Sequence, residues 1–275
     1  MKAFRGKPSI YDRRTSEPNQ AELEIRDLSL RFGGVMALNH IDLMVHTGEL
    51  LAVIGPNGAG KTSLLNCITG FYQPQEGKML FNGKEITCRP AHHLVKIGIG
   101  RTFQNIELFP GMTVLSNLFL ARHTHCRYGL GPAACFLPSV RREERAHRRV
   151  LEEIIDFLEI QSVRSKPVGS LPYGMMKRVE LGRALALEPS LLVLDEPFAG
   201  MNLEEKEDMV RFLREMNQSW QQTMVLVEHD MSIVMSISQR VAVLNFGEKL
   251  AEGRPEEIIC HPEVIKAYLG DANTI

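Results

Sequence analysis

The most chemically specific segment of the sequence is a glycine-rich run that begins at Gly55. It fits the pattern G-x-x-x-x-G-K-S/T and continues for one further residue: Gly55, Pro56, Asn57, Gly58, Ala59, Gly60, Lys61, Thr62 and Ser63. Glycines at this spacing let the backbone wrap around phosphate oxygens, so that its N–H groups and the following helix N-terminus hold negative charge. We expect Lys61 to reach the terminal phosphates and the Thr62 hydroxyl to bind Mg²⁺. The run therefore predicts a phosphate-binding loop rather than an incidental turn.

A second candidate for chemistry is the acidic pair Asp195-Glu196, which follows an apolar run. By itself, such a pair at the end of a strand is more often a helix cap or a solvated turn. With a phosphate-binding loop upstream, Asp195 can hold Mg²⁺ opposite Thr62, and Glu196 can polarise an attacking water. Together the two motifs predict an ATPase.

The segments around these motifs indicate how they are held. Leu50–Ile54 is a continuous apolar run, as expected for a strand buried on both faces, and a helix is predicted to begin near Lys61. Leu191–Leu194 and Met224–Val227 repeat the buried-strand pattern. Helical sequence lies between these strands, so we expect an α/β P-loop NTPase fold with a largely parallel core sheet.

Other strands should be antiparallel. Leu23–Leu30 alternates apolar and polar residues, and Ile41–His46 follows a turn at Phe32–Gly34. Residues 241–252 predict a hairpin near the end of the chain.

The stretch 112–159 has helical periodicity without strand-like runs, and residues 127–138 are predicted to be loop because they contain two Gly and two Pro. We expect one nucleotide-binding domain over residues 21–275, with a helical insertion at about 105–185. Residues 1–20 are predicted to be a flexible leader.

Composition argues against several other classes of protein. Lys and Arg total 32 against 33 Asp and Glu, which gives no global attraction toward nucleic acid. No apolar run approaches the roughly 20 residues needed to span a bilayer, and the N-terminus lacks the apolar stretch of a secretory signal. Five scattered cysteines without a C-x-x-C pair fit reduced thiols. A soluble, cytoplasmic protein is expected.

Further motifs resemble those of the ATP-binding subunits of ABC transporters. The segment Leu171-Pro172-Tyr173-Gly174-Met175-Met176-Lys177-Arg178 is similar to the family's signature. Gln104 resembles the family's Q-loop glutamine, His229 its switch histidine, and Phe32 the aromatic that stacks on adenine. These motifs occur in the family's order over about residues 23–270.

The resemblance implies a site for ATP and Mg²⁺ that is shared between two subunits. The implied ATP contacts are Phe32, Gly55, Pro56, Asn57, Gly58, Ala59, Gly60, Lys61, Thr62, Ser63, Gln104, Asp195, Glu196 and His229. The implied catalytic residues are Glu196, His229, Lys61 and Gln104, and the implied Mg²⁺ ligands are Thr62, Gln104 and Asp195. The residues implied to act across the dimer are Leu171, Pro172, Tyr173, Gly174, Met175 and Asn202.

The signature departs from the family's usual Leu-Ser-Gly-Gly-Gln, because it has Pro172, Tyr173 and Met175. Loss of the serine hydroxyl removes one donor to the γ-phosphate. Asn202 replaces the aspartate that is usual in the D-loop. Since proline is tolerated at the start of a helix, we expect altered contacts rather than an inactive site.

Four segments resemble the ATPases of bacterial branched-chain amino acid uptake systems: residues 101–106, the Leu-Pro-Tyr-Gly signature, residues 199–202 and residues 262–270. The resemblance implies a second ABC ATPase, integral-membrane permeases and, indirectly, a periplasmic solute-binding protein, with no nucleic acid. It also implies a peripheral position on the cytoplasmic face of the inner membrane. Relatives that import urea or short amides, and one that exports lipopolysaccharide, share much of this pattern, so the solute stays open.

Ile106, Leu108 and Phe109, with the helical insertion, are where a permease helix would dock, although packing within the subunit is equally consistent. Two other classes remain open. One is a soluble ABC protein of DNA repair or translation, which usually has paired domains or very long insertions. The other is a regulatory subunit with little hydrolysis, which the altered signature would allow.

Two weaker signals favour ordinary structure. The run His123-x-His125-Cys126 lacks a second ligand pair, so a metal site is not favoured. The arginines between Arg141 and Arg149 could attract acidic headgroups, but Glu143 and Glu144 among them favour a solvated helix.

Overall fold

The computed structural model describes residues 21–126 and 138–269, so the predicted leader and loop residues 127–137 lie outside the described residues. Pro138, predicted as loop, is instead the first residue of a helix, where its fixed φ is tolerated. The described chain divides into two compact units. The helical unit comprises 105–189 and 199–212, and the sheet unit comprises the rest.

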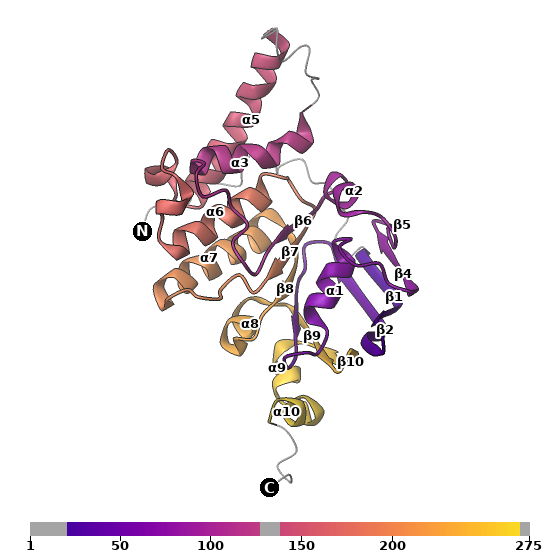
Figure 1. The fold of residues 1–275 in the computed structure, drawn as a ribbon. Helices are drawn as coiled ribbons and strands as arrows, with labels where there is room; N and C mark the ends of the chain where they lie inside the picture. The colour runs from indigo at the N-terminus through magenta and orange to yellow at the C-terminus, as the bar shows by residue number, and fades with distance from the viewer. Residues whose placement is uncertain (1–20, 127–137, 270–275) are drawn as a thin grey trace. The chain divides into compact units, whose positions relative to one another are not determined.

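The sheet unit contains a six-stranded sheet in the order β10-β9-β3-β8-β7-β6 (Figure 1). Its strands are β3 (Leu50–Ile54), β6 (Ile99–Thr102), β7 (Leu191–Asp195), β8 (Thr223–Val227), β9 (Arg240–Asn245) and β10 (Glu248–Gly253). All pairs are parallel except the β9-β10 hairpin, which confirms the predicted core sheet. Val227 pairs with both Val53 and Asp195, so the carboxyl ends of β3, β7 and β8 lie at one edge. Ligands bind at this edge in open α/β sheets.

A second, antiparallel sheet has the order β2-β1-β4-β5. Its strands are β1 (Ala21–Phe32), β2 (Val35–His46), β4 (Glu76–Phe81) and β5 (Lys84–Glu85). β2 begins at Val35, earlier than the predicted Ile41, because Val35 already pairs with Phe32 across the tight turn.

Helix α1 (Lys61–Ile68) packs between strands of the two sheets. Leu64, Leu65 and Ile68 are fully buried in the core that these strands share. Cys67 is also buried there, and burial raises the pKa of its thiol to about 12. The helix that follows the phosphate-binding loop is therefore held over its whole apolar face.

The opposite face of β3 and β9 is covered by short C-terminal helices. These are α8 (Met231–Ile237), α9 (Pro255–Ile259) and α10 (Pro262–Leu269). Val234, Ile258 and Val264 pack there against Ile54, the last residue before the phosphate-binding loop. One further helix, α2 (Ala91–Lys96), precedes β6.

The helical unit is built on α-helices, as Figure 1 shows. They are α3 (Val114–Arg122), α5 (Pro138–Phe157), α6 (Tyr173–Leu185) and the first part of α7 (Leu203–Trp220), with short 3-10 turns at His123–His125, Gln161–Val163 and Val168–Ser170. Leu151, Ile154 and Leu158, at helical spacing in the sequence, are fully buried. The Phe157 and Phe212 rings pack 5.4 Å apart.

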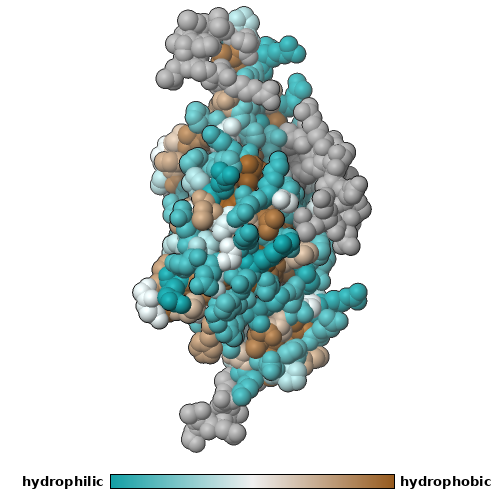
Figure 2. Space-filling view, turned by 90° about the vertical axis from the view of Figure 1, so that its right-hand side faces the viewer, coloured by the Kyte–Doolittle hydropathy of each residue, from teal (hydrophilic) through white to brown (hydrophobic). Residues whose placement is uncertain are grey.

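None of the helices in the described ranges is both long enough and apolar enough to cross a bilayer. The face drawn in Figure 2 is mainly hydrophilic, with hydrophobic residues in small groups.

Arg240 joins the amino end of the core sheet to its neighbours, because it donates to Glu49 at 2.8 and 2.9 Å and to Glu252 at 2.7 Å. Replacing Arg240 with Met leaves Glu49 without its cation, and we expect the free energy of unfolding to fall by about 2 kcal/mol. Urea denaturation measures this. Lys84→Met on the exposed β5 is the control and should change stability by less than about 0.5 kcal/mol. Equal stability of the Arg240 variant and the wild type would contradict the expectation.

Candidate functional site

Close backbone packing fixes the shape of the phosphate-binding loop. Gly55 has φ 149°, and a Cβ there would lie 2.1 Å from the carbonyl oxygen of Leu244. Gly60 has φ 102°, and its Cβ would lie 2.5 Å from the carbonyl oxygen of Ala37. Both positions therefore require glycine for conformation and for space.

The loop ends at the N-terminus of α1, which no side chain caps and which has no acidic residue in its first turn. Its N–H groups thus remain for an anion. The Lys61 ammonium donates to the carbonyls of Gly55 at 2.6 Å and Pro56 at 2.8 Å, so the cation lies against the loop. Burial lowers the pKa of Lys61, and Glu196 and Asp195 oppose this. A cation and backbone donors therefore converge at this loop, as phosphate binding requires. Thr62, the residue after Lys61 and a predicted Mg²⁺ ligand, is exposed.

Asp195 ends β7 and is only 3% exposed. Its Oδ2 accepts a hydrogen bond from Arg101 Nη2 at 2.7 Å, forming a buried ion pair. Arg101 belongs to the segment 101–106 that resembles the branched-chain amino acid ATPases, but the sequence predicted no role for its side chain. Its neighbour in space could not be predicted, because β6 and β7 are far apart in the chain.

Glu196 adopts a left-handed backbone conformation, with φ 44°, and its N–H donates to the Val227 carbonyl at 3.0 Å. Such a conformation costs a non-glycine residue about 1–3 kcal/mol and often occurs at functional sites. Gln104 Nε2 donates to Glu196 Oε2 at 2.9 Å. The structure thus brings together two residues that the sequence predicted to be catalytic.

His229 lies just after β8, with its side chain 65% exposed. The preceding Glu228, which sequence reasoning missed, is buried and accepts hydrogen bonds from the backbone N–H of Phe198 at 3.2 Å and of His229 at 3.0 Å. Burial raises the pKa of Glu228, and these N–H donors oppose the rise. Glu228 therefore ties the segment after Glu196 to the segment that carries His229.

Phe32 is 46% exposed at the end of β1, so its ring can stack on a base. Its described aromatic neighbour is Tyr72, whose ring centre lies 5.0 Å away at an interplanar angle of 74°. Tyr72 was not predicted to take part.

The signature residues lie at the start of α6 in the helical unit. Pro172 is the N-cap residue of α6, with Tyr173 exposed beside it. Gly174 is buried, and a Cβ there would lie 2.2 Å from the Glu205 carboxyl group. Gly200 faces the Tyr173 ring, and a Cβ at Gly200 would lie 2.9 Å from Cε1 of that ring. Signature and D-loop are thus packed together.

Asn202 caps the N-terminus of α7. Its side-chain oxygen accepts from the Glu205 N–H at 2.9 Å, and the Glu205 carboxylate accepts from the Asn202 N–H at 3.0 Å. Asparagine is as good an N-cap as aspartate, so Asn202 supplies the cap of α7 that an aspartate would. Leu171 is buried and Met175 is partly buried.

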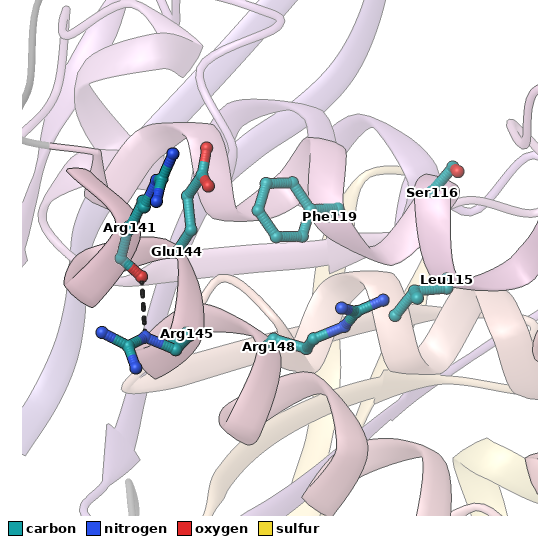
Figure 3. Close-up of a pocket in the computed structure, with 7 residues that line it drawn as sticks. All are labelled: Leu115, Ser116, Phe119, Arg141, Glu144, Arg145 and Arg148. Carbon is teal, nitrogen blue, oxygen red and sulfur yellow. Dashed lines mark hydrogen bonds between the residues drawn. The ribbon is translucent and has the colours of Figure 1, made fainter. Parts of the chain in front are cut away.

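The helical unit also contains a pocket of about 670 Å³ between α3 and α5 (Figure 3). Its lining residues are Leu115, Ser116, Phe119, Arg141, Glu144, Arg145 and Arg148. The lining has mixed charge, and none of the residues predicted for the nucleotide site belongs to it. Arg145 Nε donates to the Arg141 carbonyl at 3.2 Å.

The run 123–126 contributes one residue to a different cluster, in which ligand atoms of Cys126, Glu143 and His147 lie within 4.8 Å of one another. Arg122 donates to His147 Nδ1 through Nε at 3.2 Å and Nη2 at 3.0 Å. The ring proton is then on Nε2, the nitrogen 3.6 Å from Glu143, so that nitrogen has no lone pair for a metal. This geometry gives the cluster no support as a metal site.

A parallel sheet whose carboxyl edge carries a glycine-rich loop, a buried aspartate and an adjacent glutamate defines a P-loop nucleoside triphosphatase. Residues 38–199 match the family described as ABC transporter, and residues 248–273 match the one described as branched-chain amino acid ATP-binding cassette transporter. The chain therefore belongs to the ABC transporter family, as an ATP-hydrolysing, ATP-binding subunit.

A curated relative and two solved structures agree with this assignment. The chain is 40% identical to the high-affinity branched-chain amino acid transport ATP-binding protein BraF of Pseudomonas aeruginosa, over 91% of this chain and 98% of the relative. It resembles the ADP conformation of an ATP-binding cassette of an ABC transporter, with TM-score 0.79 and 31% identity over 93% of this chain and 100% of that one. A dimeric bacterial ABC transporter cassette has TM-score 0.71 and 25% identity over 85% and 98% of the two chains.

Replacing Glu228 with Gln tests its buried carboxyl group. The folded-state pKa lies above the ordinary 4.5, so protonation favours the folded state as pH falls through the folded pKa toward 4.5. The glutamine variant has no such proton. We therefore expect the stability of wild type relative to Glu228→Gln to increase as pH falls from about 7.5 to about 4.5, measured by urea denaturation.

The exposed Glu256→Gln is the control and should leave the pH dependence unchanged. A difference between wild type and Glu228→Gln that stays flat or shrinks at low pH would show that burial does not govern this carboxyl group.

Proposed function

We propose that this chain is the ATPase that drives import of branched-chain amino acids. The observation that carries the proposal is the match of residues 248–273 to the branched-chain amino acid cassette family. The 40% identity to BraF over nearly the whole of both chains supports it. Residues 248–273 begin at β10 and include α9 and α10, which lie outside the general ABC match.

The predicted ligand set fits ATP with Mg²⁺. Asp195 offers a carboxylate, Thr62 a hydroxyl and Gln104 an amide oxygen, and hard oxygen ligands are those that Mg²⁺ prefers. When bound, Mg²⁺ would neutralise the charge that develops on the phosphates. Lys61 and the loop N–H groups would hold the same phosphates, and Phe32 would stack on adenine.

For hydrolysis, Glu196 would accept a proton from the attacking water. Its carboxylate is held from one side by Gln104, at 2.9 Å, and its backbone by Val227, at 3.0 Å. His229, exposed beside the same sheet edge, would contact the γ-phosphate. Glu228 would fix the backbone from which His229 projects.

The site would be completed by a second ABC ATPase subunit. Tyr173 and Gly174 at the start of α6, with the α6 N-terminus, would face the γ-phosphate bound by the partner. The solved dimeric cassette and the exposure of Tyr173 support this arrangement. Membrane permeases and a periplasmic solute-binding protein would supply the translocation path, with the ATPase peripheral on the cytoplasmic face of the membrane.

Replacing Glu196 with Gln should keep ATP binding and lower turnover at least about 100-fold, because the general base is lost. ATP hydrolysis by the purified protein and nucleotide binding by fluorescence measure the two effects. The exposed Glu263→Gln is the matched control.

The Glu196→Gln and Glu263→Gln variants also test which solute is transported. Cells that lack this chain should lose uptake of labelled leucine, and the wild type but not Glu196→Gln should restore it. Loss of urea uptake with normal leucine uptake would contradict the proposed solute, and negligible turnover in both proteins would favour a regulatory subunit.

Phe109 is 54% exposed in the helical unit, and its N–H and carbonyl are held by the Asn117 side chain. A rigid backbone with an exposed aromatic side chain fits a contact for a permease helix. We expect Phe109→Asp to lower leucine uptake by about tenfold or more while ATP binding is unchanged. Ile259→Asp, at a site with similar exposure on α9, is the control. Normal uptake in vesicles with Phe109→Asp would refute the docking role.

A further inference from the structure

The Arg101 guanidinium group connects three segments around the predicted nucleotide site. Nη2 donates to Asp195 Oδ2 at 2.7 Å, while Nη1 donates to Asn66 Oδ1 at 2.6 Å and to Thr69 Oγ1 at 3.0 Å. Asn66 and Thr69 lie at the end of α1, the helix that begins at the phosphate-binding loop. One side chain therefore links β6, β7 and α1.

Two aromatic rings enclose the same guanidinium group. Its Cζ lies 5.6 Å from the centre of the Phe71 ring and 5.2 Å from that of Phe103, and the two rings meet edge to face at 5.9 Å. Cation–π contacts and the hydrogen bonds fix the plane of the guanidinium group. The Arg101 side chain is only 7% exposed, so little freedom remains.

This arrangement fixes one oxygen of Asp195 and leaves the other. Oδ2 is bound to Arg101, whereas Oδ1 has no hydrogen-bond partner within residues 21–126 and 138–269. A buried ion pair adds little net stability compared with an apolar pair, so its presence here suggests a requirement for orientation. Carboxylates that bind metals are commonly oriented by such an outer partner.

The same strand leads directly to Gln104. Arg101 lies in β6, Phe103 follows β6 and stacks on the guanidinium group, and Gln104 is bonded to Glu196. On the other side, Phe71 is followed by Tyr72, which packs on Phe32. A shift of the Arg101 side chain would therefore displace the groups that contact Asp195, Glu196 and Phe32.

We propose that Arg101 is a positioning residue that holds the Asp195 carboxylate through Oδ2, so that Oδ1 would be available to bind Mg²⁺, and that keeps Gln104 in register with Asp195. This rests on the nucleotide site of the proposed function, but not on the transported solute. A lysine can replace it only in part, because an ammonium group keeps the charge but lacks the planar fork that reaches Asp195 and α1 together and stacks between two rings.

The test separates the contribution of Mg²⁺ from that of the nucleotide. A fluorescent, non-hydrolysable ATP analogue (mant-AMPPNP) is bound to the purified chain in excess Mg²⁺ and in EDTA, and the ratio of the two Kd values is the Mg²⁺ contribution. We expect this contribution to fall about 10- to 100-fold in Arg101→Met, with a smaller fall in Arg101→Lys and little change in the Kd in EDTA. Arg240→Met is the matched control, because it loses a partly buried arginine at the other end of the sheet.

Thermal unfolding without nucleotide shows that each variant is folded. A Mg²⁺ contribution that is unchanged or larger in Arg101→Met and Arg101→Lys would overturn the proposal, since a residue with only a structural role would lower the unfolding temperature alone. A wild type without any Mg²⁺ contribution would also overturn it. Loss of leucine uptake is not used, so failure of the solute assignment is measured separately.

Discussion

The site depends on direct contact between backbones at the phosphate-binding loop. The carbonyls of Leu244 and Ala37 lie where side chains at Gly55 and Gly60 would be, and the Gly247 N–H in the turn after β9 donates to the carbonyl of Ala59 in the same loop at 3.1 Å. These contacts restrain the backbone of the loop before phosphate binds. Its N–H groups therefore keep the direction that phosphate binding requires, and little reorganisation is needed on binding.

Three carboxylates near this loop, those of Asp195, Glu196 and Glu228, are each held by hydrogen bonds from other protein groups. Arg101 neutralises Asp195, and Gln104 fixes Glu196. Glu228 is bonded by backbone N–H groups. Asp195 and Glu228 are buried and Glu196 has a strained backbone, so each of these carboxylates has a defined orientation before nucleotide binds. The helical unit follows the same rule where Asn202 and Glu205 cap α7.

Much of this arrangement could be predicted from local sequence patterns. Continuous apolar runs identified β3, β7 and β8, because a strand covered on both faces has no polar positions. The spacing from Gly55 to Thr62 identified the phosphate-binding loop, because the pattern itself encodes the backbone conformation. The edge strand β6 was missed because it contains glycine and arginine in only four residues. Pro138 was predicted to be loop because proline is a strong loop signal in a sequence. Proline also fits the first position of a helix, and the sequence alone did not distinguish the two cases.

The sequence by itself determined the class of fold, the phosphate-binding loop and the acidic pair, since each is a local pattern with a local physical cause. Only the tertiary structure decided which side chains surround the predicted site residues. Arg101 donates to Asp195, 94 positions away, and Tyr72 packs on Phe32, 40 positions away. Glu228 accepts a hydrogen bond from the N–H of Phe198, 30 positions away. Such contacts depend on strand order and on the packing of α1 between two sheets. No short pattern contains that information, because it arises when distant segments bury their apolar faces together.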